Sequence, residues 1–469
     1  MISRASFVAL RHRNYRLIWI GLMVSFTGSM MQNAALLWHV SLLVPPGRKG
    51  LALGTVGLVR FVPIVVFSLI SGVVADAWDR RRLMLFTQVA ATIVAAALAV
   101  LAFQGVTNVL PIYALAALGA AVGAFDLPAR NALVPSLVPR EHLPNAISLN
   151  TIMFQTASVV GPSLCGILIA AAGVGWVYVA NAISFAFVIV ALLMMRDVPA
   201  RQPSAPGVRD DVSLHAALEG LRFVFRSPLI RSTMLLDFFA TFFSSATALL
   251  PIFAQDILQV GAKGYGWLYA APATGALLTS AVMVPMIDRI ERRGVVLLWA
   301  VAGYGLATVV FGLSRSFWLT FLCLALTGAT DTVSMVIRNI VRQLETPDRL
   351  RGRMTGVNMV FFNGGPQLGE LEAGAVANWF GAPISVITGG IGCLLATGWI
   401  SATTPALRHY RRESGVGSRD SEVGNRESGV GIRASGVGSR ESAVGIRESA
   451  AGSGVGNTAR QGADEARKK

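Results

Sequence analysis

The chain has 469 residues, of which 54% are hydrophobic and only 14% are charged, and its mean hydropathy is +0.59. A soluble globular protein needs far more charge on its surface, so this composition excludes an ordinary soluble fold and indicates an integral membrane protein. The net charge of +15 does not indicate nucleic-acid binding, because most basic residues before the tail stand beside apolar runs and form no polar stripe.

Apolar stretches follow one another from residue 17 to residue 403, and most are about 20 residues long, the length that a helix needs to cross a bilayer. We therefore expect an all-α membrane protein with twelve transmembrane helices. The first stretch, Leu17 to Val44, is too long for the core of a signal peptide. Three isolated cysteines fit neither a disulfide framework nor a metal site, so no metal and no cofactor are expected. The predicted spans lie near residues 17–43, 51–75, 83–103, 109–129, 145–171, 174–195, 232–255, 264–287, 295–313, 317–340, 354–377 and 383–403.

Basic residues gather on one side of the predicted membrane, in clusters such as Arg80 to Arg82 and Arg292 to Arg293. Positive side chains are retained on the cytoplasmic side of a membrane. This asymmetry predicts a multi-pass protein with both termini in the cytoplasm, and we expect its membrane to be a bacterial inner membrane. The other side offers only four basic residues, which are Arg48, Lys49, Lys263 and Arg315.

The longest inner loop and the tail divide the chain. Residues 196–231 hold three prolines and an amphipathic stretch, Ser213 to Phe225, which we expect to lie at the membrane surface. The tail repeats a seven-residue unit such as Arg-Glu-Ser-Gly-Val-Gly-Ser, in which glycine is too frequent for a coiled coil, so disorder is expected. The predicted parts are a six-helix half at 1–195, a linker at 196–231, a second six-helix half at 232–410 and a disordered tail at 411–469.

Two motifs recur in the same order in both predicted halves. The second span is followed by acid, two residues, acid and two arginines, starting at Asp76, and the eighth span is followed by the same pattern, starting at Asp288. After the fourth span comes Arg130-Asn131, and after the tenth comes Arg338-Asn339. We call the step from Asp76 to Asp288 the first repeat offset and the nearly equal step from Arg130 to Arg338 the second repeat offset. The recurrence predicts one six-helix unit copied once, with the two copies enclosing a central cavity.

The stretch Gly72 to Arg81 resembles the loop signature of the major facilitator superfamily. The segments Leu10 to Gly21, Gln32 to Trp38, Asp126 to Pro135 and Gly161 to Gly166 are similar to the enterobactin-exporter-like group of that superfamily. The resemblance covers roughly residues 7 to 403. It implies the major facilitator fold and a secondary active transporter that exports a siderophore-like or drug-like molecule by alternating access, as a proton-driven antiporter.

Other functions on the same fold stay open at this point. They are an uptake symporter, a lipid flippase, and a non-transporting membrane sensor with the tail as its output. Drug exporters of the superfamily carry an arginine in the fourth helix where this chain has Leu115, so proton coupling would use another charge. A monomer is expected, and no catalytic constellation or nucleotide-binding loop indicates an enzyme.

The expected gating residues come from these motifs. A carboxylate at the inner end of the second helix can pair with arginines or with a helix N-terminus and so latch the cytoplasmic side; the alternative is a plain positive-inside anchor. The glycine and proline in the middle of the fifth helix are either a bending point or a packing kink. The candidates are Asp76, Asp79, Arg80, Arg81, Asp126, Arg130, Gly161, Pro162 and Asp288.

Charges and polar groups inside the spans are the candidates for binding substrate or protons, because buried charge in a bilayer is costly. Arg60 would suit an anionic cargo, and Asp237 lies less deep. Glu370 and Glu372 are two residues apart, so a regular helix cannot point both at one cavity. For all four charges the alternative is an interhelical pair. Two polar candidates on the first helix, Gln32 and Asn33, complete the set.

Overall fold

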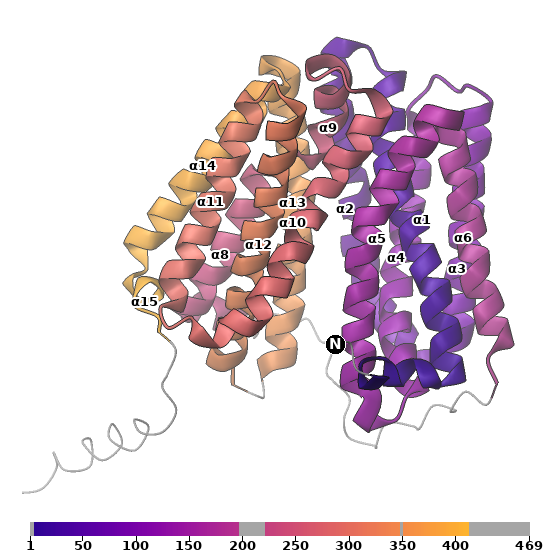
Figure 1. Cartoon of the computed structure of the whole chain (residues 1–469), viewed down its shortest axis with the longest axis horizontal. Helices are drawn as coiled ribbons and strands as arrows, with labels where there is room; N and C mark the ends of the chain where they lie inside the picture. Colours follow the sequence, from indigo (N-terminus) through magenta and orange to yellow (C-terminus); the bar gives the residue numbers. More distant parts are fainter. Residues whose placement is uncertain (1–3, 197–220, 348–349, 412–469) are drawn as a thin grey trace, which may run out of the picture. The chain divides into compact units, whose positions relative to one another are not determined.

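In the computed structural model the chain divides after Arg412 into two units. The structure describes residues 4–196, 221–347 and 350–411, all within the first unit (Figure 1). In these ranges the regular secondary structure is helical throughout. Residues 197–220 of the predicted linker and the predicted tail from residue 412 onward lie outside the described residues.

The first half contributes six long helices that correspond to the first six predicted spans. Each is apolar over most of its length, with one face buried and the other carrying exposed hydrophobic side chains such as Phe86 and Ile93. Exposed apolar surface of this kind is stable against lipid tails. The helices are α1 (Arg13–Leu43), α2 (Lys49–Ala77), α3 (Arg80–Phe103), α4 (Leu110–Leu133), α5 (Leu143–Ala172) and α6 (Val174–Met194).

The second half supplies six further spans, of which the first is broken. The predicted helix at 232–255 ends at Phe243 and continues as a 3-10 turn and a π-helical turn, Phe253–Ile257. Pro251, which has no backbone N–H to donate, lies in the short helix Leu250–Ile252 that follows the 3-10 turn Ala246–Leu249. The helices are α8 (Pro228–Phe243), α9 (Leu250–Ile252), α10 (Gly261–Met286), α11 (Arg293–Leu313), α12 (Phe317–Glu345), α13 (Arg351–Phe380), α14 (Ala382–Thr403) and the short α15 (Pro405–Arg408).

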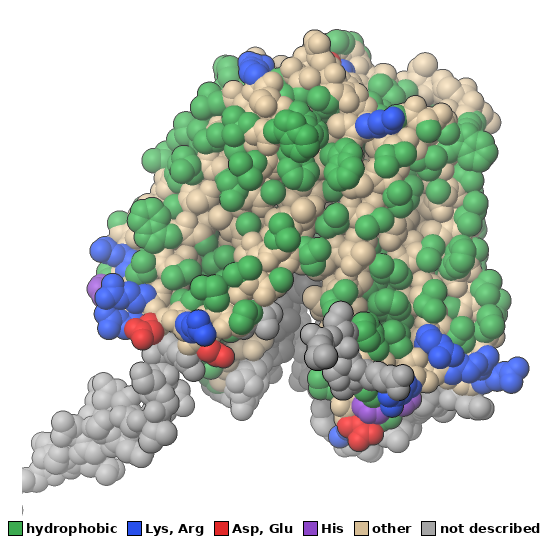
Figure 2. Space-filling view, viewed as in Figure 1, with side chains coloured by type: hydrophobic (Ala, Val, Ile, Leu, Met, Phe, Trp, Pro, Cys, Tyr) green, Lys and Arg blue, Asp and Glu red, His purple; other side chains and the backbone are tan. Residues whose placement is uncertain are grey.

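The two ends of the helices differ in charge. We call the end that carries Arg80 to Arg82 and Arg292 the basic end, and the end that carries Lys49 and Lys263 the opposite end. In Figure 2 lysine and arginine side chains gather at the lower edge, while hydrophobic side chains cover most of the surface above them.

The two halves pack against each other through two helix pairs. Figure 1 shows α1 to α6 grouped on the right and α10 to α14 grouped with α8 on the left. The most extensive contacts between the groups join α2 to α13 and α5 to α10. In chain order these are the second helix with the eleventh and the fifth with the eighth, which is the pairing expected when two copies of one unit face each other.

Glycines allow the backbones to approach at both helix pairs. A methyl group on Gly54 would lie 2.9 Å from the Cα atom of Gly374, and one on Gly166 would lie 2.9 Å from the Cα atom of Gly266. Such close approach is typical of packing between transmembrane helices. Gly266 follows Gly54 by the first repeat offset and Gly374 follows Gly166 by the second, so the contacts repeat in step with the two sequence motifs.

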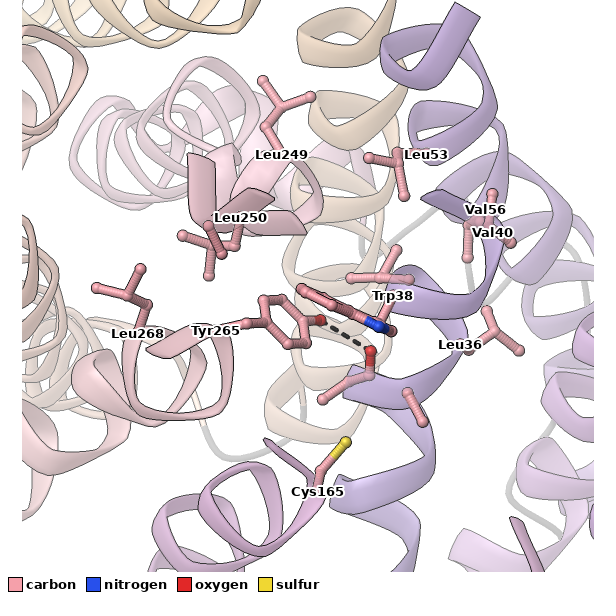
Figure 3. Packing of buried hydrophobic residues seen from close by; sticks show 14 of the residues in the cluster. Leu36, Trp38, Val40, Leu53, Val56, Cys165, Leu249, Leu250, Tyr265 and Leu268 are labelled. Carbon is pink, nitrogen blue, oxygen red and sulfur yellow. Dashed lines mark hydrogen bonds between the residues drawn. The ribbon is translucent and has the colours of Figure 1, made fainter. Parts of the chain in front are cut away.

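Among the described residues, the hydrophobic core that both halves share lies near the opposite end. There one cluster joins residues of both halves, and Figure 3 shows Trp38 and Tyr265 packed in it. Their ring centroids are 5.0 Å apart, and the Tyr265 hydroxyl donates a hydrogen bond to the carbonyl oxygen of Ala34 over 2.8 Å. Lys49 adds an ion pair to Asp256 at 3.0 Å.

Toward the basic end the buried clusters are separate. One cluster contains only residues of the first half, among them Tyr15 and Leu133, and another contains only residues of the second half, among them Leu297 and Ile337. The halves therefore close over each other at the opposite end, and nearer the basic end each is packed around its own core.

Candidate functional site

A cavity of about 450 Å³ lies inside the first half. Its wall is formed almost entirely by α1, α2, α3 and α4, with Phe185 from α6 and Gln367 from α13 of the second half. The volume is in the range of sites that hold drug-sized molecules. Its polar lining residues are Ser25, Ser29, Gln32, Asn33, Arg60, Thr87, Gln88, Asp126, Arg130 and Gln367.

Three of the six predicted binding residues line this cavity together. Arg60 of α2 donates a hydrogen bond to the side-chain oxygen of Asn33 on α1. The neighbouring Gln32 accepts a hydrogen bond from Asn181 of α6 over 2.8 Å. These bonds hold polar groups of three helices in place, and among the described residues the hydrogen-bond acceptor of Arg60 is a neutral amide.

Glu370 of α13 lies beside this group, at the contact with α2. A methyl group on Gly57 would lie 2.8 Å from its Oε2 atom, which is buried and accepts no hydrogen bond within the described part of the chain. The Glu370 carboxyl interacts electrostatically with Arg60, and both act on Tyr269 of α10. Glu372 follows two residues later, on another side of the helix, and neither glutamate is among the residues that line the cavity.

The charges of this group have no counterpart at the repeat-related helix pair. Pro272 follows Arg60 by the first repeat offset, and Glu370 follows Pro162 by the second. These are the offsets that relate the interface glycines. The α2–α13 contact thus carries an acid and a base at positions where the α5–α10 contact carries two prolines.

Asp126 and Arg130 form the intrahelical pair that their spacing predicts, at the edge of the cavity. The buried Asp126 carboxylate also accepts hydrogen bonds from Thr87 and Gln88 of α3, over 2.9 and 2.8 Å. The Arg130 guanidinium lies 4.1 Å from the ring centroid of Phe26. Thr87 and Gln88 were not predicted, because single polar residues in an apolar span have no spacing that marks them.

Asp237 lies away from the cavity, in an ion pair within the second half. Its carboxylate is 2.8 Å from Arg338 of α12, and the side chains of the two residues are 3% and 2% exposed. Asp331 is 3.5 Å from the same guanidinium. The sequence marked Arg338 as the repeat of Arg130 but did not predict its pairing with Asp237, which is distant in the chain.

The predicted gating motif makes its visible contacts inside the first half. Asp79 caps α3 by accepting a hydrogen bond from the backbone N–H of Arg82 over 2.8 Å. Arg80 and Arg81 donate to carbonyl oxygens near the C-termini of α4 and α6, over 3.0 and 3.4 Å. Arginines at helix C-termini complement the helix dipole.

Of the two acids that begin the repeated motif, Asp288 is exposed in the 3-10 turn Ile287–Arg289. The side chain of Asp76 lies outside the described residues. The latch predicted for the motif therefore stays a prediction.

Gly161 and Pro162 lie in α5, which runs through them as one helix. Gly161 packs against α1, where a methyl group would lie 2.6 Å from the Cβ atom of Met30. Gly369, which follows Gly161 by the second repeat offset, packs against Phe242 of α8 in the same way. The bending role predicted for Gly161 and Pro162 stays a prediction.

The sequence of this chain is similar to the sequences of known transporters. A family model described as transmembrane secretion effector matches residues 4–418. The enterobactin exporter EntS of Escherichia coli K12 is 27% identical over 402 residues, which cover 86% of this chain and 94% of the exporter.

Solved structures show the same fold at lower identity. A bacterial homologue of the human lysosomal transporter Spinster, solved in an inward-facing conformation, superposes with a TM-score of 0.65 at 15% identity, over 84% of this chain and 98% of that one. A bacterial homologue of the iron transporter ferroportin gives a TM-score of 0.63 at 16% identity, with the same coverage.

Proposed function

Because the chain belongs to the transmembrane secretion effector family of major facilitator transporters, we propose that it exports a small organic anion from the cytoplasm by alternating access. The observation that carries the proposal is the 450 Å³ cavity that brings Arg60, Asn33 and Gln32 together beside the contact between the halves. A related protein exports enterobactin, which supports a siderophore-like cargo.

The chemistry of the cavity favours an anionic cargo with aromatic or hydroxyl groups. Among the described residues Arg60 donates to the neutral side chain of Asn33, and an anionic group can compete with Glu370 for its other donors in a charge-assisted bond. Arg130 and Phe26, which stack on each other, both line the cavity and offer it a stacking surface. Serine and amide side chains supply the neutral donors and acceptors that orient such a ligand.

The charge difference between the two ends supports an orientation with the basic end in the cytoplasm. In that orientation the shared core near Trp38 and the Lys49–Asp256 pair close the periplasmic side. The cavity then loads from the cytoplasm. A second state would break these contacts and close the basic end, which releases the cargo outward.

Glu370 is our candidate for proton coupling. It lies at the contact between the halves and next to Arg60. Protonation would remove its attraction to Arg60 and change the energy of the α2–α13 contact. This would link the proton gradient to the movement of the two halves. Glu370 would then take the role of the arginine that drug exporters carry at the position of Leu115.

Flux into inverted membrane vesicles tests the proposal. With the vesicle interior made acidic, we expect the protein to accumulate a catecholate compound above vesicles without the protein, and to stop when the gradient is collapsed. A cationic drug and a fluorescent phospholipid serve as comparison cargoes. Transport of the phospholipid alone, or catecholate movement only in the opposite direction, would replace export of an organic anion with a flippase or an uptake symporter.

A further inference from the structure

A second cavity of about 580 Å³ lies at the basic end of the second half, between α11 and α14. It shares no lining residue with the 450 Å³ cavity of the first half. Its mouth is formed by Arg292, Arg408, His409 and Arg411, of which the first is far from the other three in the sequence. Figure 2 shows basic side chains and a histidine gathered over α15.

The fold holds these residues together through α15. The backbone N–H of Gly294, in the first turn of α11, donates to the carbonyl oxygen of Tyr410 over 3.1 Å. A side chain at Gly294 would collide with the carbonyl group of Leu407, whose own side chain is completely buried. The segment that carries Arg408 and Arg411 is thereby fixed against the start of α11, beside Arg292.

The mouth of the cavity is positively charged. None of the described residues that line it is acidic. In the described part of the chain none of its three arginines forms an ion pair with a carboxylate. Three guanidinium groups around one opening repel one another, and a phosphate group, which arginine binds through two parallel hydrogen bonds, would relieve that repulsion.

The inner wall of the cavity is mainly apolar, with the hydroxyl groups of Thr397 and Ser401 among its lining. Leu298 and Leu394 line it below the arginines, and Trp299 is 74% exposed at its rim. Trp299 also borders a second groove of about 320 Å³, where Val296 and Val333 contribute to a mainly apolar lining. Trp299 is seven residues beyond Arg292, so it lies about 10 Å further into the membrane along α11. A soluble phosphate would contact only the arginines at the mouth, whereas a lipid would contact both these arginines and the apolar surface around Trp299.

We propose that this cavity binds an anionic phospholipid from the leaflet at the basic end. The phosphate is held by Arg292, Arg408 and Arg411, and the acyl chains pack on either side of Trp299. Basic pockets between transmembrane helices are suited to such headgroups, and tryptophan is suited to the boundary between headgroups and tails. The site is independent of the proposed transport function.

Lipid binding to the purified full-length protein tests the proposal, by native mass spectrometry and by the melting temperature in nanodiscs. Nanodiscs of phosphatidylcholine are compared with nanodiscs that also contain phosphatidylglycerol. We expect phosphatidylglycerol to bind and to raise the melting temperature. The triple variant R292Q/R408Q/R411Q should bind it at least about tenfold more weakly.

The matched control is R11Q/R13Q/R16Q, which removes three exposed arginines from the basic end of the first half and should leave binding within about twofold. Trp299→Ala should weaken phosphatidylglycerol binding without removing the three charges, and it replaces the triple variant if that variant fails to fold. Equal binding of phosphatidylcholine, equal protection by inorganic phosphate alone, equal loss in the control, or unchanged binding in both site variants would each overturn the proposal.

Discussion

Glu370 occupies in α13 the position that Pro162 occupies in α5, one repeat earlier in the chain. Both residues lie next to a glycine that packs on the first helix of its half, Gly369 and Gly161. A carboxyl group can gain and lose a proton and proline cannot. The two helix pairs that join the halves are therefore alike in backbone packing and different in electrostatics, which makes the α2–α13 pair the place to look for coupling.

Glu370→Gln should reduce transport driven by a pH gradient by about tenfold or more, because the amide cannot exchange a proton. Exchange of cargo across the membrane without a gradient should persist. Reconstituted vesicles measure both. Glu372→Gln is the matched control, with an expected effect within about twofold, since Glu372 lies about 200° around the helix from Glu370, which packs against Gly57 of α2. Full pH-gradient dependence in Glu370→Gln would remove this residue from the coupling step.

Arg60→Ala should raise the Kd for an anionic cargo by about 10- to 100-fold, because it removes hydrogen bonds to a charged group. Arg60→Lys should retain part of the affinity, since it keeps the charge but loses the planar donor geometry. Titration of the purified protein measures the change. A neutral cargo of the same size should bind all three proteins alike. Unchanged affinity for the anion would mean that Arg60 is only a structural partner of Asn33.

Gly54→Leu and Gly166→Leu should each destabilise the protein by about 1–3 kcal/mol, because the added side chain overpacks a backbone contact. Thermal unfolding in detergent measures the loss. Gly123→Ala is the control, since a methyl group there meets no atom within 4 Å. Gly54 lies at the α2–α13 contact and Gly166 lies at the repeat-related α5–α10 contact. A loss confined to one of them would show that the two contacts are not equivalent.

Asp237→Asn should destabilise the second half by at most about 3–5 kcal/mol, because it removes the nearer, buried carboxylate from Arg338 and leaves the more exposed Asp331 at 3.5 Å. The double variant Asp237→Leu/Arg338→Met should recover much of the loss, since an apolar pair of similar size removes both charges. The unfolding midpoint in detergent follows both. A double variant less stable than Asp237→Asn would indicate that these two side chains stabilise the protein by more than their attraction to each other.

The sequence predicted the fold well because the lengths of the apolar stretches and the repeated motifs can both be read directly from the order of residues. Twelve spans and two related halves follow from them, and the interface glycines repeat at the same two offsets as the motifs. The break after Phe243 was missed, because the stretch from Ser244 to Ile257 is apolar enough to look like a continuation of one helix.

The site could be predicted only in part. Charges within spans identified Arg60 and Glu370, but no pattern in the sequence shows which charge faces a cavity and which faces another charge. Asp237 was therefore grouped with the binding residues, whereas the structure pairs it with Arg338. The partners of Asp126 on α3 depend on how two helices are rotated against each other, which a single sequence does not record.

The distances between the halves at the two ends test the account most directly. Spin labels at Gly47 and Lys263 report on the opposite end, and labels at Ile147 and Met286 report on the basic end. When cargo and a pH gradient are supplied to the protein in vesicles, we predict that the first distance lengthens while the second shortens. Two distances that stay fixed, or that lengthen together, would contradict alternating access.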